Sequence, residues 1–480
     1  MIIQLNSKPM TITTKPKQTV LLLLLGLFFL CIRPDFTSAQ EGPDIFLSVP
    51  MGYPAVYAKD SPEDAYVGQL ACFMQIAARV QLVRSAKAMD KISELFIEAA
   101  NLEPDPCARE YLNAMSVQVK WNSFAPLSPP WTELEQNKAE ILFFPQTQEK
   151  TGPVDSVIYV NDHAETFKYR EYTKRYLLMQ NNLPYSTRPS VPVSGFAPQL
   201  KLADLVYSSF PFTTSLVYPG PEAFYSAEYN TFKVVIFKNM VEAYVECILT
   251  PIAAKIIDAP VPQPVDAGSY LAILVLHKIT HQLGPVLEVK TMTTATTAPN
   301  MQTKDKATEP TRGKRGEKPK QKLVLASEFI GPLFPVAEEL KTQVLAIHNV
   351  SLLMDEGLIS QAEQTSIYTA YVVGLVDKIR REPFGEAGKA EVIQFNYLMK
   401  SGVIGFSLTS QKLFIQAALF PITIKALAKR VLDTYSYPSI IIKEYGQLGP
   451  ELNMLINHLH DIPYTFQLDW QLQRMRTKQK

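Results

Sequence analysis

Apolar residues recur along much of the chain at intervals of three and four, which is the spacing of one face of an α-helix. In the segment 61–102 this stripe consists of Leu82, Ala86, Met89, Ile92, Leu95, Phe96 and Ala99. Ser61, Pro62 and the acidic residues that follow suit a helix start, so we predict a long helical segment here that is broken once. The same spacing predicts helices over 337–354, 361–379, 391–400, 412–432 and 451–459.

Alternating patterns typical of strands are less frequent. Residues 154–160 predict a strand, residues 169–178 predict a helix, and the segment 232–257 begins as a strand and becomes a helix. Proline-rich stretches at 121–131 and 183–199 predict loops, because proline interrupts both kinds of element. The chain is therefore expected to have an α+β fold that is predominantly helical.

The segment Thr291–Lys322 differs from the rest in composition. It is rich in threonine and then in lysine, arginine, proline and glycine, with eight Lys or Arg against three Asp or Glu. It lacks the aromatic and branched aliphatic residues that a core needs, so we expect a disordered basic insertion. Arg312, Lys314 and Arg315 form the R-x-K-R pattern that furin-like proprotein convertases read, or a basic loop that resembles such a site by chance.

The N-terminus has the three parts of a secretory signal peptide. Lysines at positions 8, 15 and 17 precede the apolar run Val20–Ile32, and Thr37-Ser38-Ala39 offers small residues for cleavage. We predict export with cleavage after Ala39 and no stable membrane span, because the apolar run is shorter than the roughly 20 residues that a span requires. An uncleaved signal anchor is the alternative.

Composition narrows the class of protein only slightly. The chain has 480 residues, of which 47% are hydrophobic and 19% charged, and its net charge is +1. This is an ordinary globular composition with no argument for a nucleic-acid partner. Three cysteines follow the signal peptide, and they form either a Cys72–Cys107 disulfide with Cys247 left over, or three buried thiols.

Two histidines in the apolar run Tyr270–Pro285 carry the first chemical signal. His277 and His281 are four residues apart, so on a helix both imidazoles leave the same face and can reach one ion. In the zinc motif H-E-x-x-H the residue after the first histidine is a glutamate that acts as general base. Here that residue is Lys278, which is protonated at neutral pH. The spacing alone also occurs by chance on many helices.

A pair of adjacent carboxylates supplies the third feature. Glu338 and Glu339 begin an apolar helical stretch, and together with HKITHQLGP the sequence AEELKTQ resembles the dipeptidyl-peptidase III family of zinc metallopeptidases, especially its shorter members. The segments Phe237–Ala253, Ala390–Gly402 and Tyr445–Pro463 extend the resemblance, which is strong after about residue 230.

The resemblance implies a two-lobed metallopeptidase-like fold with a helical lobe for the zinc motif and a smaller mixed lobe. Its domains would be a signal peptide at 1–39, an N-terminal part at 40–290, the insertion at 291–322 and a helical C-terminal part at 323–480. It further implies that His277, His281 and Glu339 are the zinc ligands and that Glu338 orients a ligand histidine. Lys278 replaces the catalytic base.

A second departure from the family lies at Ala387, which takes the place of a histidine that helps to stabilise the transition state. With both groups missing we expect a secreted, inactive homologue that serves as a binding or regulatory protein for an unknown peptide or protein. The alternative is an active zinc hydrolase in which another carboxylate, for instance Glu338, is the base. Asn349 begins a glycosylation sequon, but the apolar periodicity around it predicts that it is buried and unmodified.

Overall fold

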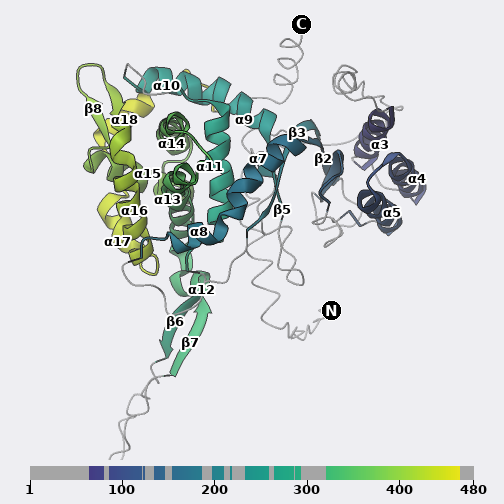
Figure 1. Ribbon diagram of the computed structural model, residues 1–480, viewed down its shortest axis with the longest axis horizontal. Coiled ribbons are helices and arrows are strands. Elements are labelled where there is room, and N and C mark those ends of the chain that lie inside the picture. Colours follow the sequence, from purple (N-terminus) through teal and green to yellow (C-terminus); the bar gives the residue numbers. More distant parts are fainter. Residues whose placement is uncertain are drawn as a thin grey trace, which may run out of the picture. The chain divides into compact units, whose positions relative to one another are not determined.

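The computed structural model describes most of the chain from Asp64 to Tyr464 (Figure 1). The described residues are 64–80, 86–121, 123–124, 134–145, 154–185, 197–209, 217–218, 233–258, 264–285, 287–292 and 320–464. The signal peptide at 1–39 and the basic residues Arg312, Lys314 and Arg315 lie outside these ranges. None of the described helices is both long enough and apolar enough to cross a membrane.

Three helices pack together in the N-terminal part. They are α3 (Asp64–Val80), α4 (Ala86–Leu102) and α5 (Pro106–Lys120), and α3 also contacts the sheet. The predicted single break is confirmed, because α3 ends at Val80 and α4 begins at Ala86. The Asp105 carboxylate starts α5 by accepting the backbone N–H groups of Cys107 and Ala108 at 2.8 and 3.2 Å.

The expected disulfide between Cys72 and Cys107 is wrong. Both residues are free thiols, Cys72 buried within α3 and Cys107 exposed at the start of α5. Burial is the first cause that raises the pKa of the Cys72 thiol to about 11, followed by the charge of Glu98. One thiol thus serves as a core residue while the other faces solvent, so their helices do not bring them together.

A five-stranded sheet follows these helices, with the strand order β1-β2-β3-β5-β4. Its strands are β1 (Ala139–Pro145), β2 (Val154–Asn161), β3 (Gln199–Ser208), β4 (Val217–Tyr218) and β5 (Lys233–Phe237). All neighbouring pairs are antiparallel except β3 and β5, which are parallel. The strands predicted at 154–160 and before residue 238 are confirmed, whereas β1 and β3 were not predicted.

Buried charges help to hold this sheet. The Glu140 carboxylate of β1 accepts hydrogen bonds from Lys201 of β3 and, at 3.4 Å, from Lys233 of β5. All three side chains are almost fully buried. A buried charge is tolerated only when it is paired, so this cluster ties three strands together.

The remaining helices form the helical part of the molecule. They are α7 (His163–Lys174), α8 (Tyr176–Asn181), α9 (Lys238–Tyr244), the π-helical turn η2 (Val245–Leu249), α10 (Thr250–Ile256), α11 (Ala267–Thr280), α12 (Ala326–Ile330), the 3₁₀ turn η3 (Gly331–Leu333), α13 (Phe334–Asp355), α14 (Gln361–Arg381), α15 (Glu386–Lys400), the 3₁₀ turn η4 (Ala417–Leu419), α16 (Phe420–Thr434), α17 (Ser439–Tyr445) and α18 (Pro450–Asn457). The helices predicted at 169–178, 337–354, 361–379, 391–400 and 451–459 lie within or close to these elements. The fold is thus α+β and predominantly helical, as predicted.

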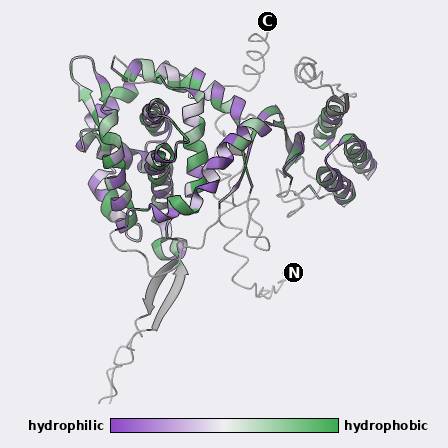
Figure 2. Cartoon of the chain, viewed as in Figure 1, coloured by the Kyte–Doolittle hydropathy of each residue, from purple (hydrophilic) through white to green (hydrophobic). Residues whose placement is uncertain are grey.

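Helix α13 is the centre of this part. It contacts α11, α14, α15 and α16, and most of its residues from Val336 to Val350 are buried. Figure 2 shows hydrophobic and hydrophilic residues interleaved along the surrounding helices, as expected where one face of each helix is buried. Asn349 of the sequon is fully buried and donates to the Leu345 carbonyl at 2.8 Å, which confirms the prediction that it is buried.

The helix predicted at 412–432 is wrong in its first part. Residues Lys412–Ile415 form strand β9, which pairs with β8 (Ile404–Ser407), and α16 begins only at Phe420. The Leu413 carbonyl also accepts the backbone N–H of Asp258 at 2.7 Å. Pairing with distant backbone groups has overridden the helical pattern, which is a common failure of local sequence arguments.

The ends of the basic insertion are ordered as strands. Strand β6 (Leu287–Met292) pairs antiparallel with β7 (Lys320–Leu325), so that Met292 lies opposite Lys320 (Figure 1). The prediction of disorder over 291–322 is therefore wrong at both ends, and residues 293–319 lie outside the described residues. Backbone pairing across the ladder compensates for the lack of a core, since it needs no particular side chains.

Candidate metal site and the pocket beside it

Both predicted histidines lie at the end of α11. The helix starts at Asp266, whose carboxylate accepts the Ser269 backbone N–H at 2.8 Å and the Ser366 hydroxyl at 2.5 Å. His281 follows the last residue of the helix but keeps helical angles, with φ −54° and ψ −31°. His277 and His281 therefore remain on one face. The chain then turns at Gly284, where φ is +88° and a Cβ would lie 3.3 Å from the Lys341 side chain.

The two imidazoles and Glu339 converge. The Nε2 atoms of His277 and His281 are 3.2 Å apart, and Glu339 Oε2 lies 3.8 Å from His277 Nε2. One ligand atom from each of the three residues lies within 4.8 Å of the others. Zinc bonds of about 2.0–2.2 Å in a tetrahedron place ligand atoms about 3.3 Å apart, so the donor set fits zinc with a small inward movement of Glu339.

Glu338 lies where it can orient His281. Its Oε1 is 3.5 Å from His281 Nδ1 and 2.9 Å from Lys341 Nζ, and its Oε2 accepts the Tyr435 hydroxyl at 2.6 Å. A carboxylate can only accept, so an Nδ1–H bonded to Glu338 leaves the lone pair of His281 on Nε2, which faces Glu339 and His277. Burial raises the pKa of Glu338, but Lys341 and His281 hold it well below its usual range.

The two oxygens of Glu339 have different partners. Oε2 faces His277, while Oε1 accepts from Gln343 and lies 3.6 Å from Lys378 Nζ. Burial raises the pKa of Glu339, but His277 and Lys378 together lower it to about 2. Burial is the main cause that lowers the pKa of His277 well below its usual value. At neutral pH the site therefore contains an ionised carboxylate and a neutral His277, which are the forms that bind a metal.

The lysine partners of the two glutamates were not foreseen from the sequence. They are Lys341 for Glu338 and Lys378 for Glu339, the latter contributed by α14. A protonated Lys278 next to His277 also needs an acidic partner, so we expect it within ion-pair reach of Glu338 or Glu339, and that contact stays a prediction. The charge of Lys278 is one of those that lower the pKa of His277.

Several other polar residues of the site were also missed. Lys341, Thr342 and Gln343 are buried on α13, in the turn that follows the two glutamates. Polar residues on a helix that is buried on every side were the available signal, because such groups need partners inside the protein. Tyr435 and Glu391 come from distant parts of the chain, and no local sequence pattern indicates that they belong to the site.

Ala387 lies in the first turn of α15, whose bounds are Glu386–Lys400. An alanine provides neither a hydrogen-bond donor nor a charge at this position. Four residues later the same helix carries Glu391, which is fully buried and accepts from Gln343 at 2.5 Å and from Lys378 at 3.1 Å. Helix α15 therefore supports the site through Glu391.

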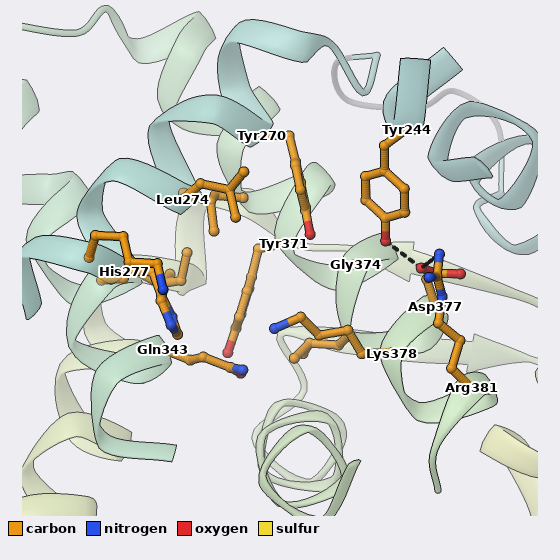
Figure 3. A pocket seen from close by; sticks show the side chains of 15 residues that line it. Tyr244, Tyr270, Leu274, His277, Gln343, Tyr371, Gly374, Asp377, Lys378 and Arg381 are labelled. Atoms are coloured by element: carbon orange, nitrogen blue, oxygen red, sulfur yellow. Dashed lines mark hydrogen bonds and ion pairs between the residues drawn. The ribbon is translucent and has the colours of Figure 1, made fainter. Parts of the chain in front are cut away.

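A pocket of about 290 Å³ lies beside His277 and Lys278 (Figure 3). It is lined mainly by residues of α11, α13 and α14, with Tyr244 from α9. Figure 3 shows His277 and Gln343 at one end, Asp377 and Arg381 at the other, and the Lys378 side chain between them. A ligand in this pocket would therefore lie next to the candidate metal site.

A His₂Glu group is a ligand set that occurs in zinc peptidases. Comparison with solved structures identifies the fold. The dipeptidyl-peptidase III structure from Caldithrix abyssi matches with a TM-score of 0.65 and 18% identity, covering 85% of this chain and 76% of that one. Dipeptidyl-peptidase III from Corallococcus sp. strain EGB matches with a TM-score of 0.57 and 18% identity, covering 79% and 67%. The chain therefore has the two-lobed fold of these structures.

Sequence comparison gives a further similarity. The Arabidopsis thaliana protein named Nudix hydrolase 3 is 24% identical over 329 residues, which are 66% of this chain and 38% of that protein. The match thus spans well under half of that relative. No family model matches the chain.

Proposed function

We propose that this chain is a secreted binding or regulatory protein that uses the dipeptidyl-peptidase III fold to hold zinc and a ligand, without efficient peptide hydrolysis. The observation that carries the proposal is the preserved convergence of His277, His281 and Glu339 beside a lysine at position 278. The three candidate ligands come together where the general base that the motif requires is replaced by a lysine.

The residues around the triad support zinc binding. His277 and His281 present Nε2 atoms 3.2 Å apart, and Glu339 offers Oε2 while Gln343 and Lys378 hold its other oxygen. When bound, zinc would act as a Lewis acid on a ligand oxygen. Glu338 Oε1 lies 3.5 Å from His281 Nδ1, which is where a carboxylate orients a ligand histidine.

The same residues argue against efficient hydrolysis. A protonated lysine cannot accept a proton from water, and loss of a general base typically costs about 10² to 10⁴ in rate. Ala387 offers no donor to a transition state, which typically costs about another 10² to 10³. Their combined loss leaves little peptidase activity.

The alternative is an active zinc hydrolase in which Glu338 supplies the base. The contacts of Glu338 count against this role. Both oxygens are occupied, Oε1 by Lys341 at 2.9 Å and Oε2 by Tyr435 at 2.6 Å. A carboxylate whose pKa is held well below its usual range is also a weak base.

Secretion is the part of the proposal that rests on the sequence alone. The apolar run Val20–Ile32 and the small residues before Gln40 support it. N-terminal sequencing of protein from the medium of expressing cells would test it, and the expected first residue is Gln40.

One experiment separates the two functions. The purified protein is dialysed against zinc, its metal content is measured by mass spectrometry, and its turnover of fluorogenic dipeptidyl substrates is followed. We expect about one zinc per chain, lost in His277→Ala and retained in the surface variant His460→Ala, with no turnover above a blank. Turnover abolished by His277→Ala would establish the enzyme, and absence of zinc in the wild type would overturn the metal site.

A further inference from the structure

The pocket beside the metal site has an apolar wall. Its apolar lining residues are Ile273, Leu274, Ala346, Ile347 and Leu375. Ile273 and Leu274 are only partly buried, although they belong to the largely apolar helix α11. Exposed apolar surface in a concave site is available to an apolar ligand.

Aromatic rings form the facing wall, and neighbouring residues hold them in place. The rings of Tyr244 and Tyr270 lie 5.2 Å apart at 52°, and Gly374 allows close approach because a Cβ there would lie 3.3 Å from Tyr270. The Tyr371 hydroxyl donates to Gln394 Oε1 at 2.6 Å. These contacts form the slot seen in Figure 3 from rings whose positions are fixed before a ligand arrives.

The polar end of the pocket is cationic. Asp377, the carboxylate among the lining residues, pairs with Arg380 at 2.8 Å and with Arg381 at 2.7 Å, and it accepts a hydrogen bond from the Tyr244 hydroxyl. Lys278, Lys378 and Arg381 line the same space, and with Arg380 they make four cations against the three carboxylates Asp377, Glu339 and Glu391. A cationic ligand is therefore disfavoured here and an anionic one favoured.

Lys378 is the group best placed to meet an anion. Its Nζ lies 3.1 Å from Glu391 Oε1 and 3.6 Å from Glu339 Oε1. Its side chain is 39% exposed, whereas its partner Glu391 is fully buried. Figure 3 shows Lys378 reaching into the space between Tyr371 and Asp377. The ammonium is thus paired with two carboxylates, while part of the side chain faces the pocket.

We propose that this pocket binds a small organic acid with an aromatic or aliphatic body, its carboxylate against Lys378 and its body between the tyrosine rings and the apolar wall. A pocket of about 290 Å³ is at the lower limit for drug-sized ligands, which suits a molecule the size of a substituted propionic acid. The inference rests on the proposed binding function and names the class of its ligand.

The test uses 3-phenylpropionate and its neutral isostere 3-phenylpropionamide, titrated by calorimetry into the purified chain in zinc-free buffer. We expect the acid to bind at least tenfold more tightly than the amide, because only the acid has a charge for Lys378. Lys378→Met should remove that preference, while Lys400→Met, on an exposed lysine of α15, should keep it. Circular dichroism verifies the fold of each variant.

A second variant covers the case in which Lys378→Met does not fold. Leu274→Trp fills the pocket from a partly exposed position and should abolish binding of both probes. Equal binding of acid and amide, no binding of the acid to the wild type, or unchanged binding in Leu274→Trp would overturn the inference. Because the titration needs no zinc and no turnover, its failure is distinguishable from failure of the metal or activity assays.

Discussion

Lys341 and Glu338 lie one turn apart on α13 and form an ion pair of 2.9 Å behind the candidate metal site, where the lysine side chain is 2% exposed. Glu338 in turn faces His281, the proposed zinc ligand, so the charge of Lys341 acts on His281 through Glu338. We predict that Lys341→Met destabilises the protein by roughly 3 kcal/mol at pH 7, as removal of one partner of a buried pair does. Zinc affinity should fall about 10- to 100-fold.

The pH dependence of the stability lost in Lys341→Met follows from the ionisation of Glu338. Its pKa is lowered from 4.5 in the folded state, so its contribution is complete above about pH 4.5 and is lost as pH falls through the folded pKa. The cost of Lys341→Met, measured by urea denaturation, should therefore be smaller at pH 4 than at pH 7. Lys429→Met, which breaks an exposed pair with Asp433, is the control with little effect at either pH. Equal costs for the two variants would contradict the prediction.

Replacing Lys278 by glutamate should raise zinc affinity without restoring family-level turnover. The change removes a cation beside the metal position and supplies a base, but it leaves Ala387 as it is. Lys278→Met separates the two effects because it removes the charge alone. We expect zinc affinity to increase from wild type to methionine to glutamate. Full peptidase turnover in Lys278→Glu would mean that the other losses were overestimated.

Buried His348 should make the zinc-free protein sensitive to mild acid. Burial lowers its pKa in the folded state, and its Nε2 lies 3.1 Å from the Asn182 carbonyl. The unfolded state then binds more protons as pH falls below about 6.5, so stability should decline from pH 7 to pH 5. In His348→Gln this decline should be shallower in urea titrations. An unchanged slope would show that His348 does not titrate between the two states.

After cleavage at Arg315, the two fragments should remain associated. The proposed processing site lies between β6 and β7, whose backbones pair from Leu287 to Met292, and α11 packs directly on α13 across the cut. A denaturing gel of secreted protein should show two fragments, and size exclusion should show one species. Arg315→Ala should give one band. One full-length band for the wild type as well would exclude processing.

Local patterns in the sequence place each half of the candidate metal site. His277 and His281 share one helical face, and Glu338 with Glu339 is one dipeptide, but only the family resemblance implied that the two motifs meet. Most of the helical part followed from the same periodicity. These predictions needed no knowledge of which elements touch.

What the sequence could not supply is the packing between helices. Lys378 reaches Glu339 from α14, Glu391 from α15 approaches Gln343, and Tyr435 binds Glu338 from the end of α16. Each contact joins residues that lie far apart in the chain, and none is encoded by a local pattern. The prediction of a helix at residues 412–415 was wrong for the same reason, because pairing with β8 makes this segment strand β9.

The tip of the β6–β7 ladder is a position at which the protein can accept inserted sequence. Because Met292 lies opposite Lys320, whatever joins these two residues begins and ends at nearly one point. Lengthening such a connection costs little, about 0.6 kcal/mol for each doubling, and does not alter the spacing of α11 and α13. The tip of this ladder is thus a natural place for grafting foreign segments, where a tag or a whole domain can be added without disturbing the histidines or the glutamates.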